Sequence, residues 1–79
     1  MLRRAAAALG RGEDAEAAAL YREHAERFAR GALIELREAG LARLRCRAQD
    51  DDDAVLADFL ARFPGSPHAA RLQRECTPP

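Results

Sequence analysis

Part of the sequence occurs twice, and this internal repeat constrains the fold more than any other feature. A shift of 35 residues superimposes these similar or identical pairs: Ala19 on Ala54, Leu20 on Val55, Tyr21 on Leu56, Ala25 on Leu60, Arg27 on Arg62 and Phe28 on Phe63. Both copies end in a helix-breaking stretch, at residues 29–31 and 64–66. A period of this length is typical of repeats built from two helices and short loops. The repeat therefore predicts an all-α fold, a short stack of antiparallel helical hairpins.

The sequence contains many alanines and few large apolar side chains, and this composition favours helices that pack closely. Of the 79 residues, 19 are Ala, whereas Leu, Ile, Val, Met, Phe and Tyr together number 17. Ala has the highest helix propensity and lets helix backbones approach one another. So few large apolar side chains form a thin core. Stability then depends on close helix packing, a disulfide or a covering partner.

Glycines, prolines and an acidic run divide the chain into about five helical segments. We expect helices at residues 2–9, 15–28 and 32–48, from the acidic run 50–53 to residue 63, and at 67–75. The expected breaks are residues 10–14, 30–31, 49–53 and 64–67, with Asp52 or Asp53 capping the fourth helix. Alternating strand patterns are absent. Residues 1–79 form either a single small domain or an excised piece of a longer repeat array.

The segment 32–48 carries apolar residues on two faces. One line contains Leu33, Leu36, Gly40 and Leu44, widened by Ile34 and Leu41, and a second face contains Ala39, Ala42 and Cys46. A helix of this kind is packed on both sides. Gly40 within it costs about 1 kcal/mol relative to Ala, so we expect a neighbouring helix to use the space of the missing methyl group.

Arg37 lies inside the apolar arc of this segment. An unpaired buried charge costs several kcal/mol, so the guanidinium must have a partner or reach water. Three arrangements remain open: the side chain reaches solvent, it pairs with a carboxylate such as Glu35 or Glu38, or it pairs with an acid supplied by a binding partner.

These features resemble the tetratricopeptide repeat family over nearly the whole chain. Residues 12–17 are similar to the family's turn into a second helix, and Tyr21 occupies its large aromatic slot. Gly40 precedes Pro64 by 24 residues, which is the family's spacing. The stretch 59–69, Phe-Leu-Ala-Arg-Phe-Pro-Gly-Ser-Pro-His-Ala, is similar to the turn of such repeats in bacterial envelope proteins.

The resemblance implies a non-catalytic interaction module that binds a peptide or a partner helix in a helical groove. In the family's register the groove is lined by Ile34, Arg37, Leu41 and Leu44, with Arg37 able to hold a carboxylate. Arg43 departs from the family, which places a large core residue at this slot. The alternative is a structural, oligomerising helical bundle whose apolar faces meet other copies and which has no separate ligand.

The resemblance also brings the two cysteines to like ends of successive parallel helices. Cys46 and Cys76 lie 30 residues apart, which excludes a CxxC motif. They either form a disulfide or remain two thiols. A disulfide implies an oxidising compartment, such as the bacterial periplasm or envelope, and free thiols imply the cytoplasm.

Several function classes find no support in the sequence. Basic and acidic side chains balance at 13 each, so no net field attracts nucleic acid. Apolar runs stay far below the roughly 20 residues of a membrane span. His24 and His68 lack paired metal ligands, and Ser66 belongs to a Pro-Gly-Ser-Pro turn rather than to a catalytic triad. We expect no enzymatic activity, no metal and no cofactor.

Overall fold

The computed structural model describes residues 1–28, 33–48 and 52–76, and within these ranges it is all-helical. Five helices follow one another: α1 (Leu2–Gly10), α2 (Asp14–Arg27), α3 (Ile34–Arg47), α4 (Asp52–Arg62) and α5 (Ala69–Cys76). The all-α prediction is confirmed. The expected break at 30–31 lies outside the described residues, as do residues 49–51 of the expected break at 49–53. Asp52 and Asp53, which were expected to cap the fourth helix, are instead its first two residues.

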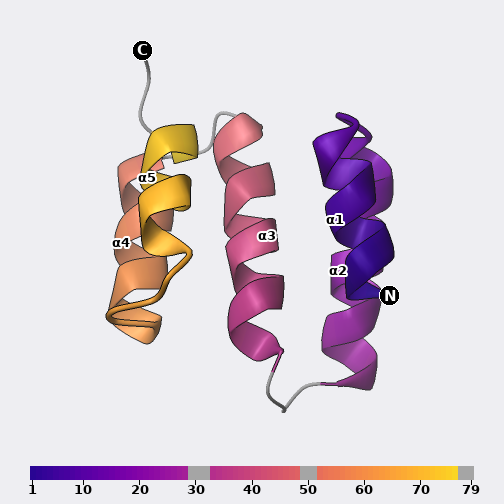
Figure 1. The fold of residues 1–79 in the computed structure, drawn as a ribbon, viewed down its shortest axis with the longest axis horizontal. Helices are drawn as coiled ribbons and strands as arrows, with labels where there is room; N and C mark the ends of the chain where they lie inside the picture. The colour runs from indigo at the N-terminus through magenta and orange to yellow at the C-terminus, as the bar shows by residue number, and fades with distance from the viewer. Residues whose placement is uncertain (29–32, 49–51, 77–79) are drawn as a thin grey trace.

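Helix α3 stands at the centre of the fold, between two helix pairs (Figure 1). On one side α1 lies in front of α2, and on the other side α5 lies in front of α4. Each helix packs against the next, and α3 also contacts α1 and α5. This arrangement is compatible with a helical repeat, because the first helices of successive hairpins, α1, α3 and α5, lie side by side.

Two apolar clusters meet at α3. The first joins α1 and α2 to one residue of α3 and contains Leu2, Ala5, Ala8, Leu9, Ala17, Leu20, Tyr21 and Leu44. The second joins α3 to α4 and α5 and contains Ala39, Ala42, Cys46, Val55, Phe59, Leu72 and Cys76. The prediction that this helix is packed on two faces is therefore confirmed, and alanines form much of both contacts.

The closest approach between α2 and α3 depends on Gly40. A Cβ atom at this position would lie 2.7 Å from Cε1 of Tyr21, and closer still to Cζ and Oη of the same ring. Tyr21 is 3% exposed, so its packed ring would have to shift to admit a methyl group at position 40. The space of the missing methyl group is thus filled by an aromatic ring, as expected from the sequence.

Three large apolar residues are exposed, although the sequence predicted that two of them, Leu33 and Leu36, lie on a packed face of the third helix. Phe28 follows the last residue of α2, and Leu33 and Leu36 lie at the beginning of α3; they are 53%, 51% and 42% exposed. Helix α3 has 14 residues, whereas α1 has 9 and α5 has 8. The shorter neighbours cannot cover the whole length of α3, which leaves its first turn accessible.

The last helix begins two residues later than the sequence suggested. The hydroxyl oxygen of Ser66 accepts a hydrogen bond from the backbone N–H of His68 (3.1 Å), and its carbonyl accepts one from Ala69 (3.1 Å). Residues 64–68 therefore form a turn, in which Gly65 has a φ of +77°. Pro67 belongs to this turn and not to the first turn of α5.

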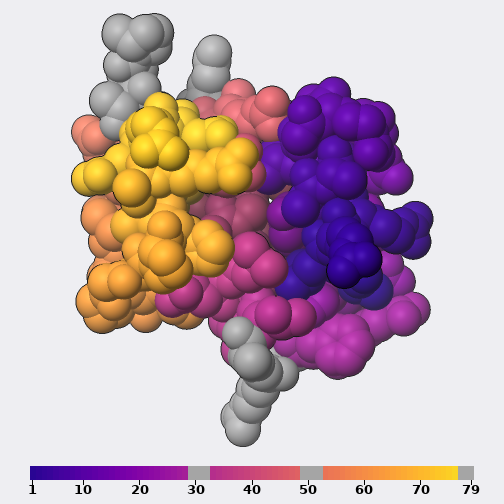
Figure 2. All heavy atoms as spheres, in the orientation of Figure 1, coloured from indigo at the N-terminus to yellow at the C-terminus, as the bar shows by residue number. Residues whose placement is uncertain are grey.

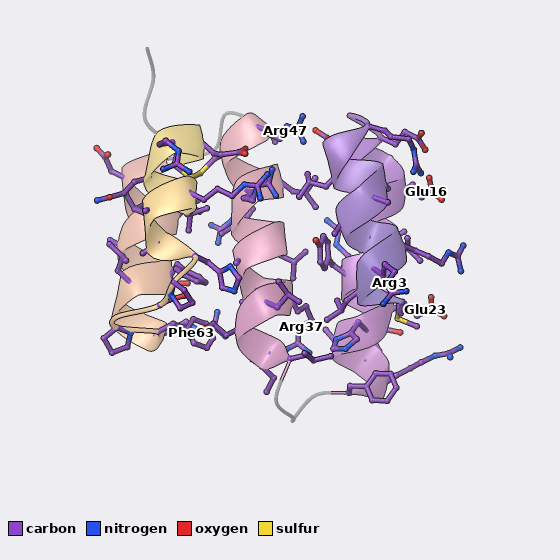
Figure 3. All side chains as sticks on the ribbon, viewed as in Figure 1. Arg3, Glu16, Glu23, Arg37, Arg47 and Phe63 are labelled. Carbon is purple, nitrogen blue, oxygen red and sulfur yellow. A yellow bond between two sulfur atoms is a disulfide. The ribbon has the colours of Figure 1, made fainter. Side chains whose placement is uncertain are left out.

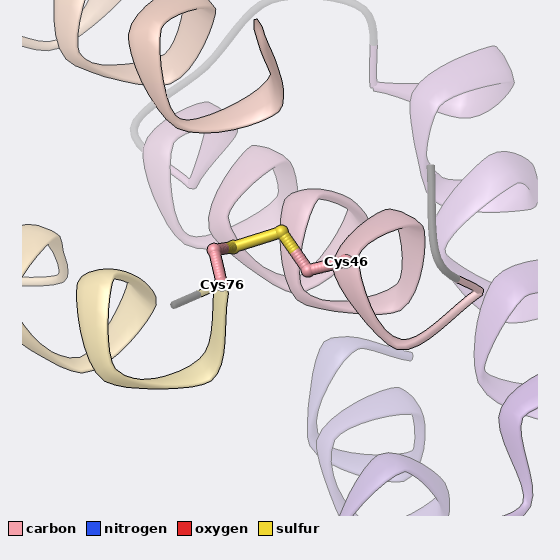
Figure 4. The surroundings of a disulfide bond; sticks show 2 residues. All are labelled: Cys46 and Cys76. Atoms are coloured by element: carbon pink, nitrogen blue, oxygen red, sulfur yellow. A yellow bond between two sulfur atoms is a disulfide. The ribbon is translucent and has the colours of Figure 1, made fainter. Parts of the chain in front are cut away.

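A disulfide joins Cys46, near the end of α3, to Cys76, at the end of α5 (Figure 4). The Cα atoms are 5.1 Å apart, a separation typical of disulfides. Both cysteines are buried in the second apolar cluster. The bond closes a loop that contains all of α4.

We predict that Gly40→Ala destabilises the protein, although Ala is the better helix former. The new methyl group collides with the buried ring of Tyr21, and overpacking of this kind costs about 1–3 kcal/mol. Urea unfolding followed by circular dichroism measures the change. Gly10→Ala is the matched control, since no atom lies within 4 Å of a Cβ at that position. The loss should shrink in a Tyr21→Leu background; an unchanged loss there would contradict the proposed collision.

Removal of the disulfide should lower the free energy of unfolding by about 3 kcal/mol, because the covalent loop restricts the unfolded chain. The test compares oxidised wild type with Cys46→Ala/Cys76→Ala by thermal and urea unfolding. Mass spectrometry after alkylation without reductant verifies that the wild-type thiols are paired. Equal stability of the two proteins would contradict a stabilising role of the bond.

Candidate functional site

Side chains of α3 form polar contacts with α1, α2, α4 and α5, and also with Phe28, the residue that follows α2. Nη1 of Arg47 donates to the carbonyl of Leu9 in α1 (2.9 Å) and lies 3.3 Å from a carboxylate oxygen of Asp14 in α2. Nη2 of Arg43 donates to Glu75 in α5 (2.7 Å). These contacts fix the positions of the helices around α3 where the apolar core is thin.

Arg37 is the most buried member of this set, with 6% of its surface exposed. Nε donates to the carboxylate of Glu38 (3.0 Å), and Nη1 donates to the carbonyl of Phe28 (2.9 Å) and lies 3.4 Å from Nδ1 of His24. Figure 3 shows the side chain extending from α3 toward the end of α2. Of the three arrangements that the sequence left open, the structure has the internal acid.

Glu38 extends the network of Arg37 to α4. Its second carboxylate oxygen accepts a hydrogen bond from Nη1 of Arg62 (2.9 Å). The chain of contacts thus runs from α4 through α3 to the end of α2. Loss of one member of such a buried pair is strongly destabilising, because the other charge remains buried without a partner.

The network shifts the pKa of two groups in the same direction. Burial lowers the pKa of His24 from its usual 6.5, and the neighbouring Arg37 guanidinium lowers it further. Burial alone would raise the pKa of Glu38, but the hydrogen bonds and charges of Arg37 and Arg62 outweigh it, so the pKa lies below the usual 4.5. The folded protein therefore favours a neutral His24 imidazole and an ionised Glu38 carboxylate, each in contact with Arg37.

The predicted groove residues do not share one surface. Leu41 and Leu44 line a surface groove of about 410 Å³ between α2 and α3, together with Asp14, Ala15, Ala18, Arg22, Arg45 and Ala48. Ile34 is half-buried and is not part of this lining. Arg37 is also absent from the lining, and its three contacts are all within the chain.

A second hollow, of about 150 Å³, lies on the face where α1 and α5 flank α3. Figure 2 shows this face, with atoms of α3 between the indigo atoms of α1 and the yellow atoms of α5. The lining consists of Ala6, Tyr21, Leu36, Ala39, Gly40, Arg43, His68, Arg71 and Leu72. Sequence reasoning did not identify this site. The signal that could have found it was Arg43, a charged residue at a slot where the repeat pattern calls for a large apolar one.

The pKa shifts predict that stability falls in two steps as the solution is acidified. A lowered pKa means that the unfolded state binds more protons, so stability is complete above the unfolded pKa and is lost below it. The first loss should begin near pH 6.5 (His24) and the second near pH 4.5 (Glu38). Urea unfolding from pH 8 to pH 2 measures both steps. His24→Gln should remove the first step alone, whereas an unchanged profile would show that His24 does not cause it.

Across 1–28, 33–48 and 52–76, no three His, Cys, Asp or Glu side chains are grouped so that they could hold a metal ion. None of the helices described there has the length and apolar character to cross a membrane. Comparisons of the chain with protein families, curated proteins and solved structures found no match.

Proposed function

We propose that this protein is a non-catalytic interaction module, built in the manner of tetratricopeptide repeats, that binds a peptide or a partner helix. The order of the helices supports the repeat, since α3 packs on the preceding hairpin and on both other first-type helices. The disulfide in turn favours an oxidising compartment, such as the bacterial envelope.

The groove between α2 and α3 is the observation that carries this proposal. Its floor consists of Leu41, Leu44 and three alanines, Ala15, Ala18 and Ala48. Small side chains along one wall leave room for apolar side chains of a second helix, which is the usual mode of helix-in-groove recognition. The exposed Arg22 at the rim can pair with an acidic residue of the ligand.

Arg37 contributes to this function by fixing the walls of the groove. Its hydrogen bond to the Phe28 carbonyl joins the end of α2 to α3. A groove whose walls are already held in place loses less entropy when a ligand binds. Arg37 is therefore a positioning residue and not a contact to a ligand carboxylate.

The test uses peptides selected from a library of amphipathic helices against the oxidised protein. We expect the selected peptides to shift the amide resonances of Ala18 and Leu41, and to bind at least about tenfold more weakly to Leu41→Asp. Leu33→Asp is the matched control, because Leu33 is exposed just before the same helix and lines neither this groove nor the hollow between α1, α3 and α5. Equal losses in both variants, or resonance shifts confined to other surfaces, would contradict the proposal.

A second candidate function rests on the exposed apolar residues at one end of the molecule. Phe28, Leu33 and Leu36 are each more than two-fifths exposed and lie near the junction of α2 and α3. Contact of this patch with another copy would make the protein a structural, oligomerising bundle. A molecular mass that rises with concentration, and returns to that of the monomer in Leu33→Ser/Leu36→Ser, would favour this function over peptide binding.

A further inference from the structure

The hollow between α1, α3 and α5 has a chemistry different from that of the proposed peptide groove. Arg43 of α3 and Arg71 of α5 line it together with His68, which precedes α5. Leu36 and the ring of Tyr21 supply apolar surface in the same hollow. A small space that combines cationic groups with apolar walls suits an anion that carries a hydrocarbon group.

The positive charge of the hollow is only partly neutralised by the protein itself. Both guanidinium groups face one carboxylate, that of Glu75, which lies 2.7 Å from Nη2 of Arg43 and 3.9 Å from Nε of Arg71. Two positive charges therefore share one negative charge, and the contact with Arg71 is long. A second carboxylate would complete the pairing.

Arg43 also has hydrogen-bonding capacity left. An arginine offers five N–H donors. Glu75 accepts from Nη2, whereas Nε is buried and has no hydrogen-bond partner among residues 1–28, 33–48 and 52–76. Buried donors without an acceptor are rare in folded proteins and call for an explanation. A guanidinium held in place with unused donors is prepared for a further acceptor.

We propose that this hollow binds a small organic carboxylate with a short aliphatic chain. The carboxylate lies between Arg43 and Arg71, and the aliphatic chain lies on Leu36 and the ring of Tyr21. The volume of about 150 Å³ limits the ligand to a few carbon atoms. The acid can be a free metabolite or the carboxyl terminus of a peptide, since both present the same chemistry.

Binding in the hollow can be measured by the fluorescence of Tyr21. This residue is the only tyrosine in a chain without tryptophan, so the intrinsic fluorescence of the oxidised protein comes from a residue that lines the hollow. Hexanoate is the probe, and hexanamide is its uncharged counterpart. We expect a saturable change in fluorescence with hexanoate and a much weaker response to hexanamide.

Two variants on α5 test the role of charge. Arg71→Gln should weaken hexanoate binding by about tenfold, the loss expected for one charge-assisted contact. Arg74→Gln is the matched control, since Arg74 is an exposed arginine on the same helix and does not line the hollow. Circular dichroism verifies that both variants keep the fold.

The source of the carboxylate is distinguished with an acetylated tripeptide, used with a free carboxyl terminus and as its amide. Tighter binding of the free-acid peptide than of hexanoate, lost in the amide, assigns the site to a peptide terminus; weaker binding assigns it to a free acid. The proposal is overturned if hexanoate gives no saturable change, if hexanamide binds equally well, or if Arg71→Gln and Arg74→Gln bind alike.

Discussion

The contact between the Tyr21 ring and the bare backbone of Gly40 sets the geometry of the whole molecule. It fixes how closely α2 approaches α3, and α3 in turn contacts every other helix. The same ring forms part of the hollow on the opposite side, where α1 and α5 flank α3. The packing of one aromatic side chain thus connects the core to a candidate binding surface, and a change in it would alter both.

Arginine side chains strengthen the fold where the apolar core is thin. Alanines bring the helices close together but bury little surface each. Arg37 and Arg47 donate to backbone carbonyls at or just beyond the ends of α2 and α1, where helices leave such groups without internal partners. Arg43 and Arg62 form ion pairs between α3 and its neighbours on the other side. Because a guanidinium has several donors, one side chain can satisfy two helices at once.

The local pattern of the sequence was sufficient to predict the helices, but it was insufficient to predict most of the surface. Helices α1 and α2 begin and end close to the expected residues, because Gly10, Gly12 and the acidic residues after them mark a boundary that depends on nearby residues alone. The positions of Phe28 and Leu36 could not be predicted, since their exposure depends on how far the neighbouring helices extend. The partner of Arg37 was open for the same reason, although Glu38 was among the candidates.

The candidate sites likewise contain some residues that the sequence could predict and others that it could not. Leu41 and Leu44 were placed in a groove from the resemblance to a repeat, and both do line one, whereas Ile34 and Arg37 do not. Positions three, four and seven residues apart share one face of a helix, so these four residues differ mainly in their position along α3. Ile34 and Arg37 lie near the beginning of the helix, whereas the groove is lined by residues of its second half. The second hollow is lined by residues of four helices and a turn, and no local sequence pattern predicts that these residues come together.

The covalent loop closed by Cys46 and Cys76 also determines how the molecule would respond to tension. A force applied to the two ends of the chain passes through the disulfide and bypasses the 29 residues between the cysteines. At about 3.5 Å per residue, roughly 100 Å of chain therefore cannot be drawn out. Helix α4 and most of α5 would carry no load, whereas the segment that precedes Cys46 could extend. Half of the fold would behave as a rigid anchor while the other half yields, for as long as the bond stays oxidised.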